Sequence, residues 1–340
     1  SIPAKMKNED LINKFQKYFE EPIIKIELMS HPGNNKNYKI QTTKGQFIVK
    51  EYTTFQKDNW NRGLREFETL TYLKNIGITN LPSPIKFIKE DNLGIYSFLP
   101  GILRKPQEVN EQDILAASNF LADLHNIDLE FKNNVPKERT ACFSIQDYFK
   151  LIEDRIKNLS NYNDSLPLAN ELKEFLINNI IPLKENLKQK MPSNIYNELS
   201  LNEQVLTPGD YGFHNILVHT ADTTSNPTPQ KDYAFLDFEY FGRDDPLKQI
   251  LDFLHHDRHK AISTKLRNLF LQNYLDKTNK REEFSKRIHL IDPLIGLNWT
   301  LIYLTPFTKE TLNQEELLRT RLNKAKTKIE NIRYLKSGFF

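Results

Sequence analysis

The sequence predicts an α+β protein with two lobes, a small antiparallel β-sheet lobe followed by a larger and mainly helical lobe. In the first hundred residues, apolar and polar side chains alternate over short runs, which is the pattern of half-buried strands. After "LPG" at 99–101, apolar residues recur at helical spacing over much longer segments. A length of 340 residues is long for one hydrophobic core and suits two.

The alternation predicts the elements of the first lobe. "IIKIELM" indicates one strand, and "NYKIQTTKGQFIVKEY" indicates a hairpin that turns at its Lys-Gly pair. A helix is expected over 8–20 and a second over 61–78, followed by two strands within 84–101.

The second lobe is expected to be mostly helical. Two short strands, "NILVH" and "YAFLDFEY", lie between its helices. The expected helices span 111–127, 144–159, 168–187, 246–256, 261–276, 282–304 and 313–335. We place the first lobe at 1–97 and the second at 98–340, with a hinge near 97–101.

Composition excludes several classes of protein. The net charge of +3 comes from 47 basic and 44 acidic side chains, and no basic block contains interleaved aromatics, so a nucleic-acid partner is not expected. Cys142 is the only cysteine, which excludes an internal disulfide and fits a reducing cytoplasm. No apolar run approaches the roughly 20 residues that span a bilayer, and the N-terminus lacks the core of a signal peptide. We therefore expect a cytoplasmic protein with no membrane partner.

Five polar residues occur in the order that phosphoryl transfer requires. That chemistry needs a cation at the nucleotide phosphates, oxygen ligands for Mg²⁺ and a carboxylate at the attacking hydroxyl. "FIVKEY" places Lys50 on a strand, and Glu66 lies on the following helix, where it can orient Lys50. Asp210 and Asn215 have the D-x-x-x-x-N spacing of kinase catalytic loops. Asp237 ends the apolar run "YAFLD" and is the expected second oxygen ligand for Mg²⁺.

Each of these residues also has a plain structural interpretation. Lys50 and Glu66, taken singly, would be ordinary solvated charges, and Asp210 and Asn215 would be turn residues. Asp237 is harder to explain in this way, because a carboxylate in a strand between aromatic residues is costly unless it is paired or bound to metal. The joint order and spacing of all five favour the chemical interpretation.

These motifs resemble those of the aminoglycoside phosphotransferase and choline kinase superfamily, which has a bilobal, protein-kinase-like fold. "PGDYGFHNIL" is similar to the family's catalytic stretch H-G-D-x-x-x-x-N-I-L, and "LDFEYFGRDDPLKQILDF" is similar to its metal-binding stretch. Gly33, Asn35 and Tyr38 resemble the G-x-x-N-x-x-Y pattern that precedes the lysine strand. "REFETLTYL", "FLPG" and "LADLHNID" are further similarities, and the resemblance extends from about residue 25 to 260.

The resemblance implies a nucleotide-binding first lobe and a catalytic, substrate-binding second lobe that use ATP and Mg²⁺. Asp210 would be the catalytic carboxylate at the substrate hydroxyl, and Asn215 and Asp237 would hold Mg²⁺. Lys50, oriented by Glu66, would contact the α- and β-phosphates. The hinge residues that would receive the adenine through their backbone are Ser97, Phe98 and Leu99.

The sequence departs from the family pattern in three places. Pro208 stands where the family has His, a residue that supports the catalytic loop, so the rigidity of this loop is in question. The phosphate loop "SHPGNNKN" has a single glycine, Gly33, and would form an unusual lid. The stretch "HTADTTSNPTPQKD" at 219–232 is long for a link between two strands and is expected to project as a hairpin tip.

A small-molecule kinase is the favoured function, ahead of an inactive nucleotide-binding module and of a protein kinase. Asp245 follows Asp237 too closely for a long activation segment, and no A-P-E stretch follows. The inactive alternative rests on Pro208 and the glycine-poor loop. Against it, the residues expected to carry out phosphoryl transfer are all present: Lys50, Asp210, Asn215 and Asp237.

The expected acceptor is a hydroxyl of a sugar, an amino alcohol or a related metabolite. Residues 281–340 hold 11 Lys and Arg against 7 Asp and Glu, which disfavours a polycationic aminoglycoside, although Asp252 or Asp257 could offset this locally. Trp299 and Tyr303 share a helix face, where they either stack on a ligand or, as is commoner, pack in the core. The sequence does not indicate whether ATP or GTP is the preferred nucleotide, nor does it indicate the oligomeric state.

Overall fold

The computed structural model describes residues 8–29, 35–54, 60–193, 197–220, 231–309 and 314–333. The chain divides into two compact units. The first comprises Ser1–Arg104 and Phe213–Phe241, and the second comprises Lys105–Gly212 and Gly242–Phe340. The first unit is built on antiparallel sheets and the second is mainly helical, so the predicted α+β class is confirmed.

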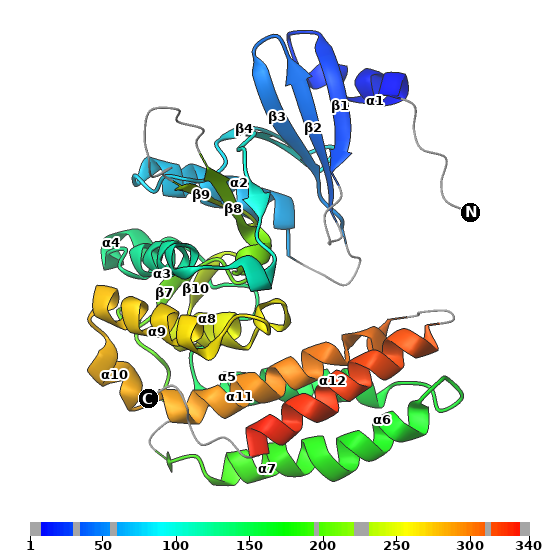
Figure 1. Ribbon diagram of the computed structural model, residues 1–340, viewed down its shortest axis with the longest axis vertical. Coiled ribbons are helices and arrows are strands. Elements are labelled where there is room, and N and C mark those ends of the chain that lie inside the picture. The colour runs from blue at the N-terminus through cyan, green and yellow to red at the C-terminus, as the bar shows by residue number, and fades with distance from the viewer. Residues whose placement is uncertain are drawn as a thin grey trace. The chain divides into compact units, whose positions relative to one another are not determined.

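A five-stranded antiparallel sheet forms most of the first unit, and its strands β1, β2 and β3 run side by side in Figure 1. The strand order is β1-β2-β3-β5-β4. Its strands are β1 Ile23–Met29, β2 Lys36–Thr42, β3 Gly45–Glu51, β4 Pro84–Ile88 and β5 Leu93–Ser97. The β2–β3 hairpin closes with Thr42 opposite Gly45, whose φ of +142° is accessible to glycine but rarely to other residues.

Two helices belong to the first unit. α1 (Asn8–Phe15) buries Phe15 completely against the sheet, where its ring centroid lies 4.8 Å from that of Tyr38. α2 (Arg62–Asn75) starts at Asn61, whose side chain accepts a hydrogen bond from the Leu64 N–H and so caps the helix. The expected spans of both helices are longer than the observed ones, as is usual because helix ends fray.

The segment 213–241 adds a second small sheet to the first unit, with strand order β6-β8-β9. Its strands are β6 Ile102–Leu103, β8 Ile216–Thr220 and β9 Lys231–Phe235, and a 3₁₀ turn, Phe213–Asn215, precedes β8. β9 ends two residues before Asp237, so the expectation that this carboxylate lies within a strand was wrong. The Leu236 N–H donates to the Asn215 carbonyl at 2.8 Å and joins the two loops.

The second unit packs its helices in layers, and α11 and α12 run side by side in Figure 1. Its helices are α3 Glu111–His125, α4 Leu129–Lys132, α5 Ile145–Ser160, α6 Ala169–Phe175, α7 Ile181–Gln189, α8 Pro246–His255, α9 Thr264–Thr278, α10 Arg281–Ser285, α11 Ile288–Tyr303 and α12 Glu315–Arg333. The strands β7 Val205–Thr207 and β10 Gly242–Asp244 form a two-stranded sheet. These strands, like β6, were not expected, because two or three residues are too few to show a period.

Two expected helices are interrupted. The span 168–187 holds a π-helical turn, Leu176–Ile180, between α6 and α7, and the span 282–304 divides into α10 and α11. Amphipathic spacing continues across both interruptions, so it indicates which face is buried but not where the hydrogen-bond ladder changes.

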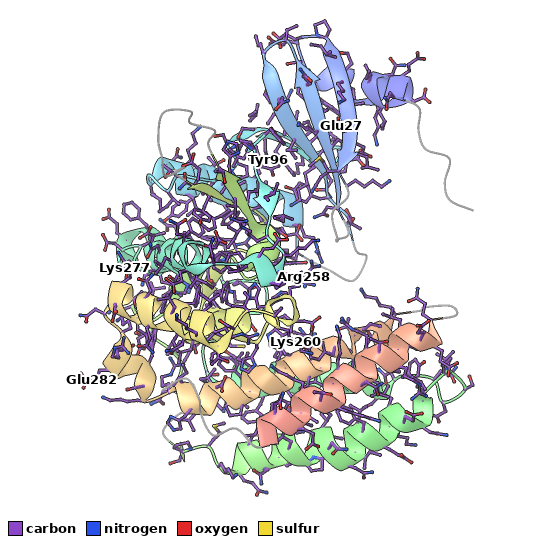
Figure 2. The ribbon with its side chains drawn as sticks, viewed as in Figure 1. Glu27, Tyr96, Arg258, Lys260, Lys277 and Glu282 are labelled. Atoms are coloured by element: carbon purple, nitrogen blue, oxygen red, sulfur yellow. The ribbon has the colours of Figure 1, made fainter. Side chains whose placement is uncertain are left out.

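Aromatic side chains are buried in the cores of both units, among aliphatic ones. In the first unit Tyr96, labelled in Figure 2, is a buried residue of β5. In the second, Phe253 and Phe270 stack with ring centroids 3.9 Å apart. Tyr303 is buried within α11, so its side chain packs in the core. Among the helices that the structure describes, none combines the length and apolar character needed to cross a bilayer.

Candidate active site

The first unit holds a buried ion pair between a strand and a helix. Lys50 is on β3 and Glu66 is in the second turn of α2, so the pair joins the sheet to its covering helix. The Lys50 Nζ lies 2.8 Å from Glu66 Oε1, with the side chains only 12% and 5% exposed. The Tyr52 hydroxyl donates to the same carboxylate oxygen at 2.6 Å. Two donors on one oxygen fix the Glu66 carboxylate and hence the direction of the amine.

The other Glu66 oxygen reaches the loop that follows β9. Glu66 Oε2 accepts the Phe238 N–H at 2.6 Å. The preceding residue, Asp237, has a φ of +68°, a left-handed conformation that is costly for a residue with a Cβ and is common at functional sites. This conformation places Asp237 Oδ1 3.9 Å from the Lys50 Nζ. Lys50 thus faces two carboxylates, and Asp237 is the more exposed one.

Burial and charge act in opposite directions on this pair. Burial raises the pKa of Glu66, but the Lys50 ammonium and the hydrogen bonds from Lys50, Tyr52 and Phe238 outweigh burial, so the pKa lies below its ordinary value. Burial likewise lowers the pKa of Lys50, and the charges of Glu66, Asp237 and Glu239 more than offset it. Both groups are therefore charged at neutral pH.

A second cluster holds the same loop at Glu239. One Glu239 oxygen accepts from Asn35 Nδ2 at 2.7 Å and the other from Arg62 at 3.2 Å. The Trp60 indole N–H donates to the Glu239 carbonyl at 2.6 Å, and Asn35 also accepts the Thr53 N–H at 3.0 Å. The loop containing Asp237 is therefore tied to α2 through Arg62, to Trp60 just before that helix, and to Asn35 just before β2.

A cavity of about 170 Å³ opens beside the ion pair, within the first unit. Its walls are largely apolar and include Met29, Ile48, Leu70, Leu217 and Leu236. The predicted site residues that line it are Lys50, Glu66, Ser97, Phe98, Leu99 and Asp237. The structure thus brings six of the eight predicted site residues around one cavity, and Asn215 is joined to this group through the backbone bond to Leu236.

In the second unit, Asp210 lies on a loop that is held by α8. The Gln249 side-chain oxygen accepts from the Thr207 hydroxyl at 2.6 Å and from the Gly209 N–H at 2.8 Å. Gly209 has a φ of +84°, which glycine adopts without strain. Pro208 therefore does not leave the loop unsupported, because Gln249 holds the residues on either side of it.

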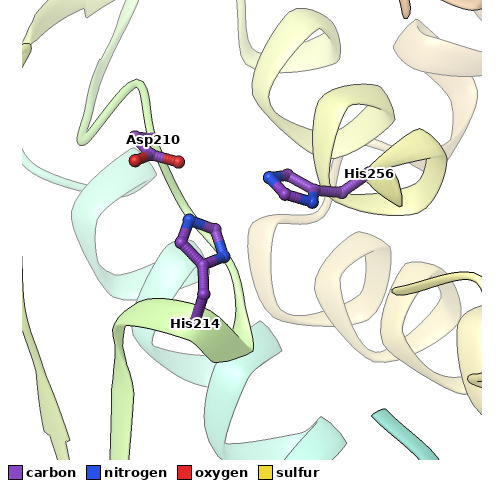
Figure 3. Close-up of side chains that lie close together, drawn as sticks. All are labelled: Asp210, His214 and His256. Atoms are coloured by element: carbon purple, nitrogen blue, oxygen red, sulfur yellow. The ribbon is translucent and has the colours of Figure 1, made fainter. Parts of the chain in front are cut away.

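His256, which follows α8, faces Asp210 within the second unit. An imidazole nitrogen of His256 lies within 4.8 Å of an Asp210 carboxylate oxygen. Figure 3 shows the His256 ring pointing toward that carboxylate, and it also draws His214, a residue of the 3₁₀ turn Phe213–Asn215. The Arg258 N–H donates to His256 Nδ1 at 3.2 Å, so Nδ1 is an acceptor and Nε2 carries the proton of the neutral ring.

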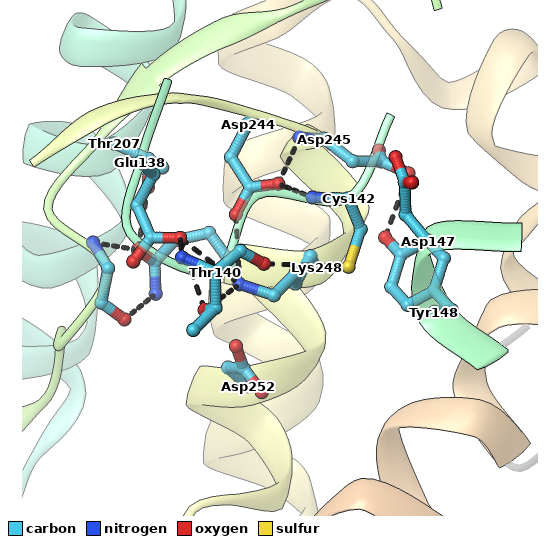
Figure 4. A network of polar contacts seen from close by, with 12 residues as sticks. Glu138, Thr140, Cys142, Asp147, Tyr148, Thr207, Asp244, Asp245, Lys248 and Asp252 are labelled. Carbon is cyan, nitrogen blue, oxygen red and sulfur yellow. Dashed lines mark hydrogen bonds and ion pairs between the residues drawn. The ribbon is translucent and has the colours of Figure 1, made fainter. Parts of the chain in front are cut away.

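The start of α8 is buried among charged groups (Figure 4). Asp245 caps the helix by accepting the Leu247 N–H at 3.0 Å, and it forms an ion pair with Arg287 at 2.5 Å. Lys248 lies 2.9 Å from Asp244 and 3.5 Å from Glu138, so two buried carboxylates share one ammonium. These contacts fix α8 and with it Gln249, at the cost of desolvating several charges.

Asp252, one turn further along α8, is a carboxylate whose neighbours offset only part of the cost of burying its charge. The Trp299 indole N–H donates to it at 3.0 Å. Burial raises the pKa of Asp252 to about 6, against the lowering effect of Lys248. Trp299 is therefore engaged with Asp252 and with the His256 ring, whose centroid lies 4.7 Å away.

Several of these residues were missed from the sequence. Gln249, Arg62 and Trp60 carry no recognisable motif, since their importance comes from partners far along the chain. Glu239 and Asn35 did stand within quoted motifs, and their mutual contact could have been suspected from that. The expectations for Gly33 and for most of 219–232 fall outside the described residues.

With this geometry established, comparison with known proteins defines the class. Residues 25–284 match the model of the phosphotransferase enzyme family, and the chain belongs to that family. The superfamily resemblance drawn from the motifs is confirmed. A comparison with curated protein sequences returned no match.

Solved structures share the fold over nearly the whole chain. A spectinomycin phosphotransferase in complex with ADP and spectinomycin is 12% identical, with a TM-score of 0.63, covering 98% of this chain and 100% of its own. A choline kinase from Streptococcus pneumoniae is 17% identical, with a TM-score of 0.60 and coverage of 95% and 99%. A Plasmodium vivax ethanolamine kinase is 18% identical, with a TM-score of 0.57 and coverage of 96% and 97%. The expected kinase-like fold is confirmed.

Proposed function

We propose that the protein transfers the γ-phosphoryl group of ATP to a hydroxyl of a small molecule. The observation that carries this proposal is the buried Lys50–Glu66 pair, which is directed at Asp237 on the wall of a largely apolar cavity. A fixed cation beside an oxygen ligand, next to a cavity for an aromatic base, is what nucleotide phosphoryl transfer requires.

Lys50 neutralises charge on the α- and β-phosphates, and Glu66 fixes the direction of the Lys50 amine. Asn215 and Asp237 would hold Mg²⁺, since both offer hard oxygen donors and Asp237 keeps its carboxylate partly exposed at 24%. Bound Mg²⁺ would supply charge neutralisation at the phosphate oxygens. Asp210 accepts the proton of the attacking hydroxyl.

The adenine is proposed to contact the backbone between β5 and Pro100. The Ser97 N–H already donates to the Ser83 carbonyl at 2.9 Å, and the Phe98 N–H to the Gln46 carbonyl at 3.3 Å. Within the described parts of the chain the Leu99 N–H has no such partner, and Leu99 lines the cavity. Leu99 N–H is therefore the proposed donor to the base.

The acceptor is proposed to be a sugar, an amino alcohol or a related metabolite. The names of the structural neighbours support a small acceptor, because they include choline, ethanolamine and spectinomycin kinases. The alternative is a catalytically inactive nucleotide-binding module. It is less well supported, because Gln249 holds the Asp210 loop even though Pro208 replaces the family's His.

The test is release of ADP by the purified protein with Mg²⁺-ATP and a panel of hydroxylated metabolites. At least one compound should stimulate release, and Asp210→Ala should abolish it. Turnover that survived in Asp210→Ala would show that the catalytic assignment is wrong.

Thermal unfolding with and without ATP and Mg²⁺ tests nucleotide binding, which the two functions share. Both an active kinase and an inactive module predict a higher Tm with nucleotide, by mass action on the native state. Only the active kinase predicts ADP release. No rise in Tm at millimolar nucleotide would contradict both.

A further inference from the structure

Away from the proposed site, α8, α11 and α12 bring three ionisable side chains into one chain of hydrogen bonds. His255, the last residue of α8, places Nε2 2.5 Å from Asp292 Oδ1 on α11. On the other side of the ring, Lys328 Nζ on α12 lies 2.7 Å from His255 Nδ1. An ammonium can only donate, so Nδ1 is the acceptor and Nε2 carries the proton that is donated to Asp292.

The packing of the three helices is built around this contact. Gly296 lies on α11 where an added Cβ would meet Ile332 at 2.9 Å and the His255 ring at 3.6 Å. The absence of a side chain therefore lets α12 and His255 both approach α11. The His255 and Asp292 side chains are only 10% and 9% exposed, so the ring has little freedom to turn away from either partner.

The carboxylates near Lys328 do not offset the effects of burial and of the nearby cations on its ammonium group. Its surroundings include the cations Arg267 and Lys260 and the anions Asp292 and Asp257; Lys260 is labelled in Figure 2. Burial, the largest effect, and the two cations lower the pKa of Lys328 to about 8, although the two carboxylates raise it. Burial also lowers the pKa of His255, which keeps the ring neutral and able to accept a proton.

Lys324, one turn earlier on α12, provides the contrast. Its Nζ pairs directly with Asp257 at 3.2 Å. Lys328, among the described residues, makes no direct ion pair and instead reaches Asp292 only through His255. The two lysines on this helix thus differ in their nearest partner, which is an imidazole for Lys328 and a carboxylate for Lys324.

We propose that Lys328 is a nucleophilic lysine and a site of acyl modification, with His255 as its general base and Asp292 as the residue that orients His255. The order nucleophile, imidazole, carboxylate is the arrangement that activates nucleophiles in covalent catalysis. Because Arg267 and Lys260 lie near the amine, the fitting donor is an anionic acyl compound, and an acyl phosphate is such a compound.

The step balances without a further reactant. The unprotonated Lys328 Nζ attacks the acyl carbon, and a C–N bond forms. The bond from that carbon to the phosphate oxygen breaks, and its electron pair leaves with inorganic phosphate. The Nζ proton passes to His255 Nδ1, forming an imidazolium beside Asp292, and then to solvent. The product is a neutral amide at Lys328.

Acetyl phosphate and the folded full-length protein provide the test. Initial rates of acetylation at Lys328 and Lys324 are measured at pH 7.4 by peptide mass spectrometry. A lysine of pKa about 8 has roughly two orders of magnitude more free amine than an ordinary one at this pH, and since lower basicity offsets part of that gain we expect a rate about tenfold higher at Lys328. The Lys328 rate should rise with pH to a midpoint near 8, and both lysines should react equally in urea.

His255→Gln and Asp292→Asn are the informative variants, with folding checked by circular dichroism. Each should reduce the Lys328 rate toward that of Lys324. Equal rates at the two lysines in the folded wild type would overturn the proposal, and so would a fast Lys328 rate that His255→Gln leaves unchanged. If that variant does not fold, the wild-type pH profile decides, because a midpoint above 10 is that of an ordinary lysine. A neutral donor, p-nitrophenyl acetate, completes the test. If Lys328 no longer reacted faster than Lys324 with this donor, the preference would come from binding of the anionic donor and not from an activated amine, and the proposal would be overturned.

Discussion

At the scale of single residues, the loop that carries Asp210 depends on a backbone angle that only glycine adopts freely. Gly209 precedes Asp210 and has a φ of +84°. We expect Gly209→Ala to lower the free energy of unfolding by about 1–2 kcal/mol, the cost of a left-handed conformation for a residue with a Cβ. Because the strain sits next to Asp210, kcat should fall as well, as measured by ADP release.

Gly45 offers the matched control. It also has a positive φ, +142°, and lies in the β2–β3 turn with open space around it. Gly45→Ala should lower the free energy of unfolding measured in urea without lowering kcat. Equal losses of kcat in the two variants would mean that the activity follows stability and not the position of Asp210.

Asp252 leads to a pH-dependent prediction. Burial raises its pKa to about 6, above the ordinary carboxyl value of 3.8. A raised pKa in the folded state gives stability that is present below pH 3.8 and is lost as the pH rises through 6, since the charged form is the disfavoured one. Asp252→Asn removes this penalty and keeps an acceptor for Trp299 Nε1. The variant should therefore be more stable than the wild type at pH 7, by up to about 3 kcal/mol.

Urea unfolding at pH 7 and pH 4 checks this. The difference in free energy of unfolding between Asp252→Asn and the wild type should be smaller at pH 4 than at pH 7. An Asp252→Asn variant that is less stable than the wild type at pH 7 would contradict the prediction. A gain in stability together with a loss of kcat would indicate that the carboxylate is retained for function.

At the scale of elements, α8 is the helix that supports the loop carrying Asp210. Gln249 bonds Thr207 and Gly209 at once, while Asp245 and Lys248 anchor the start of the helix. Gln249→Met has a similar size but leaves the Thr207 hydroxyl and the Gly209 N–H without their acceptor. A buried donor left unsatisfied costs about 1–3 kcal/mol. We expect a loss of stability in that range and a clear fall in kcat with little change in the KM for ATP.

Thr207→Val is the control for Gln249→Met. It removes one hydrogen bond and leaves the bond from the Gly209 N–H to Gln249. If α8 acts by positioning Asp210, the fall in kcat should be much smaller in Thr207→Val. Equal falls in kcat would assign the effect to general destabilisation.

At the scale of the whole molecule, local patterns predicted elements better than they predicted partners. The strands of the first sheet and the helices α3, α5 and α8 follow from apolar spacing, since each buries one continuous face. Lys50 and Glu66 could be paired from the sequence because the strand and the following helix are neighbours. Gln249 and Arg62 could not be paired in this way, because the two sides of each contact lie far apart in the chain and no periodicity links them.

Chain order also hides how the first unit is assembled. The segment Phe213–Phe241 belongs to it, although more than a hundred residues separate this segment from Arg104. It supplies Leu217, Leu236 and Asp237 to the cavity, the Phe238 N–H to Glu66, and the strand β8 that pairs with β6. A fragment ending at residue 104 would keep Lys50 and Glu66 but would lose one wall of the cavity.

We therefore expect a fragment of residues 1–104 to bind no ADP under conditions where the full chain binds it, measured by titration calorimetry. Without residues 213–241, Glu66 loses the Phe238 N–H and the cavity loses the apolar side chains of Leu217 and Leu236, so neither the charge pair nor the base would be shielded from water. A peptide spanning 213–241 added in trans should restore part of the binding, because it supplies both. Binding of ADP by the fragment alone, as tight as by the full chain, would show that the first hundred residues already form the complete nucleotide site.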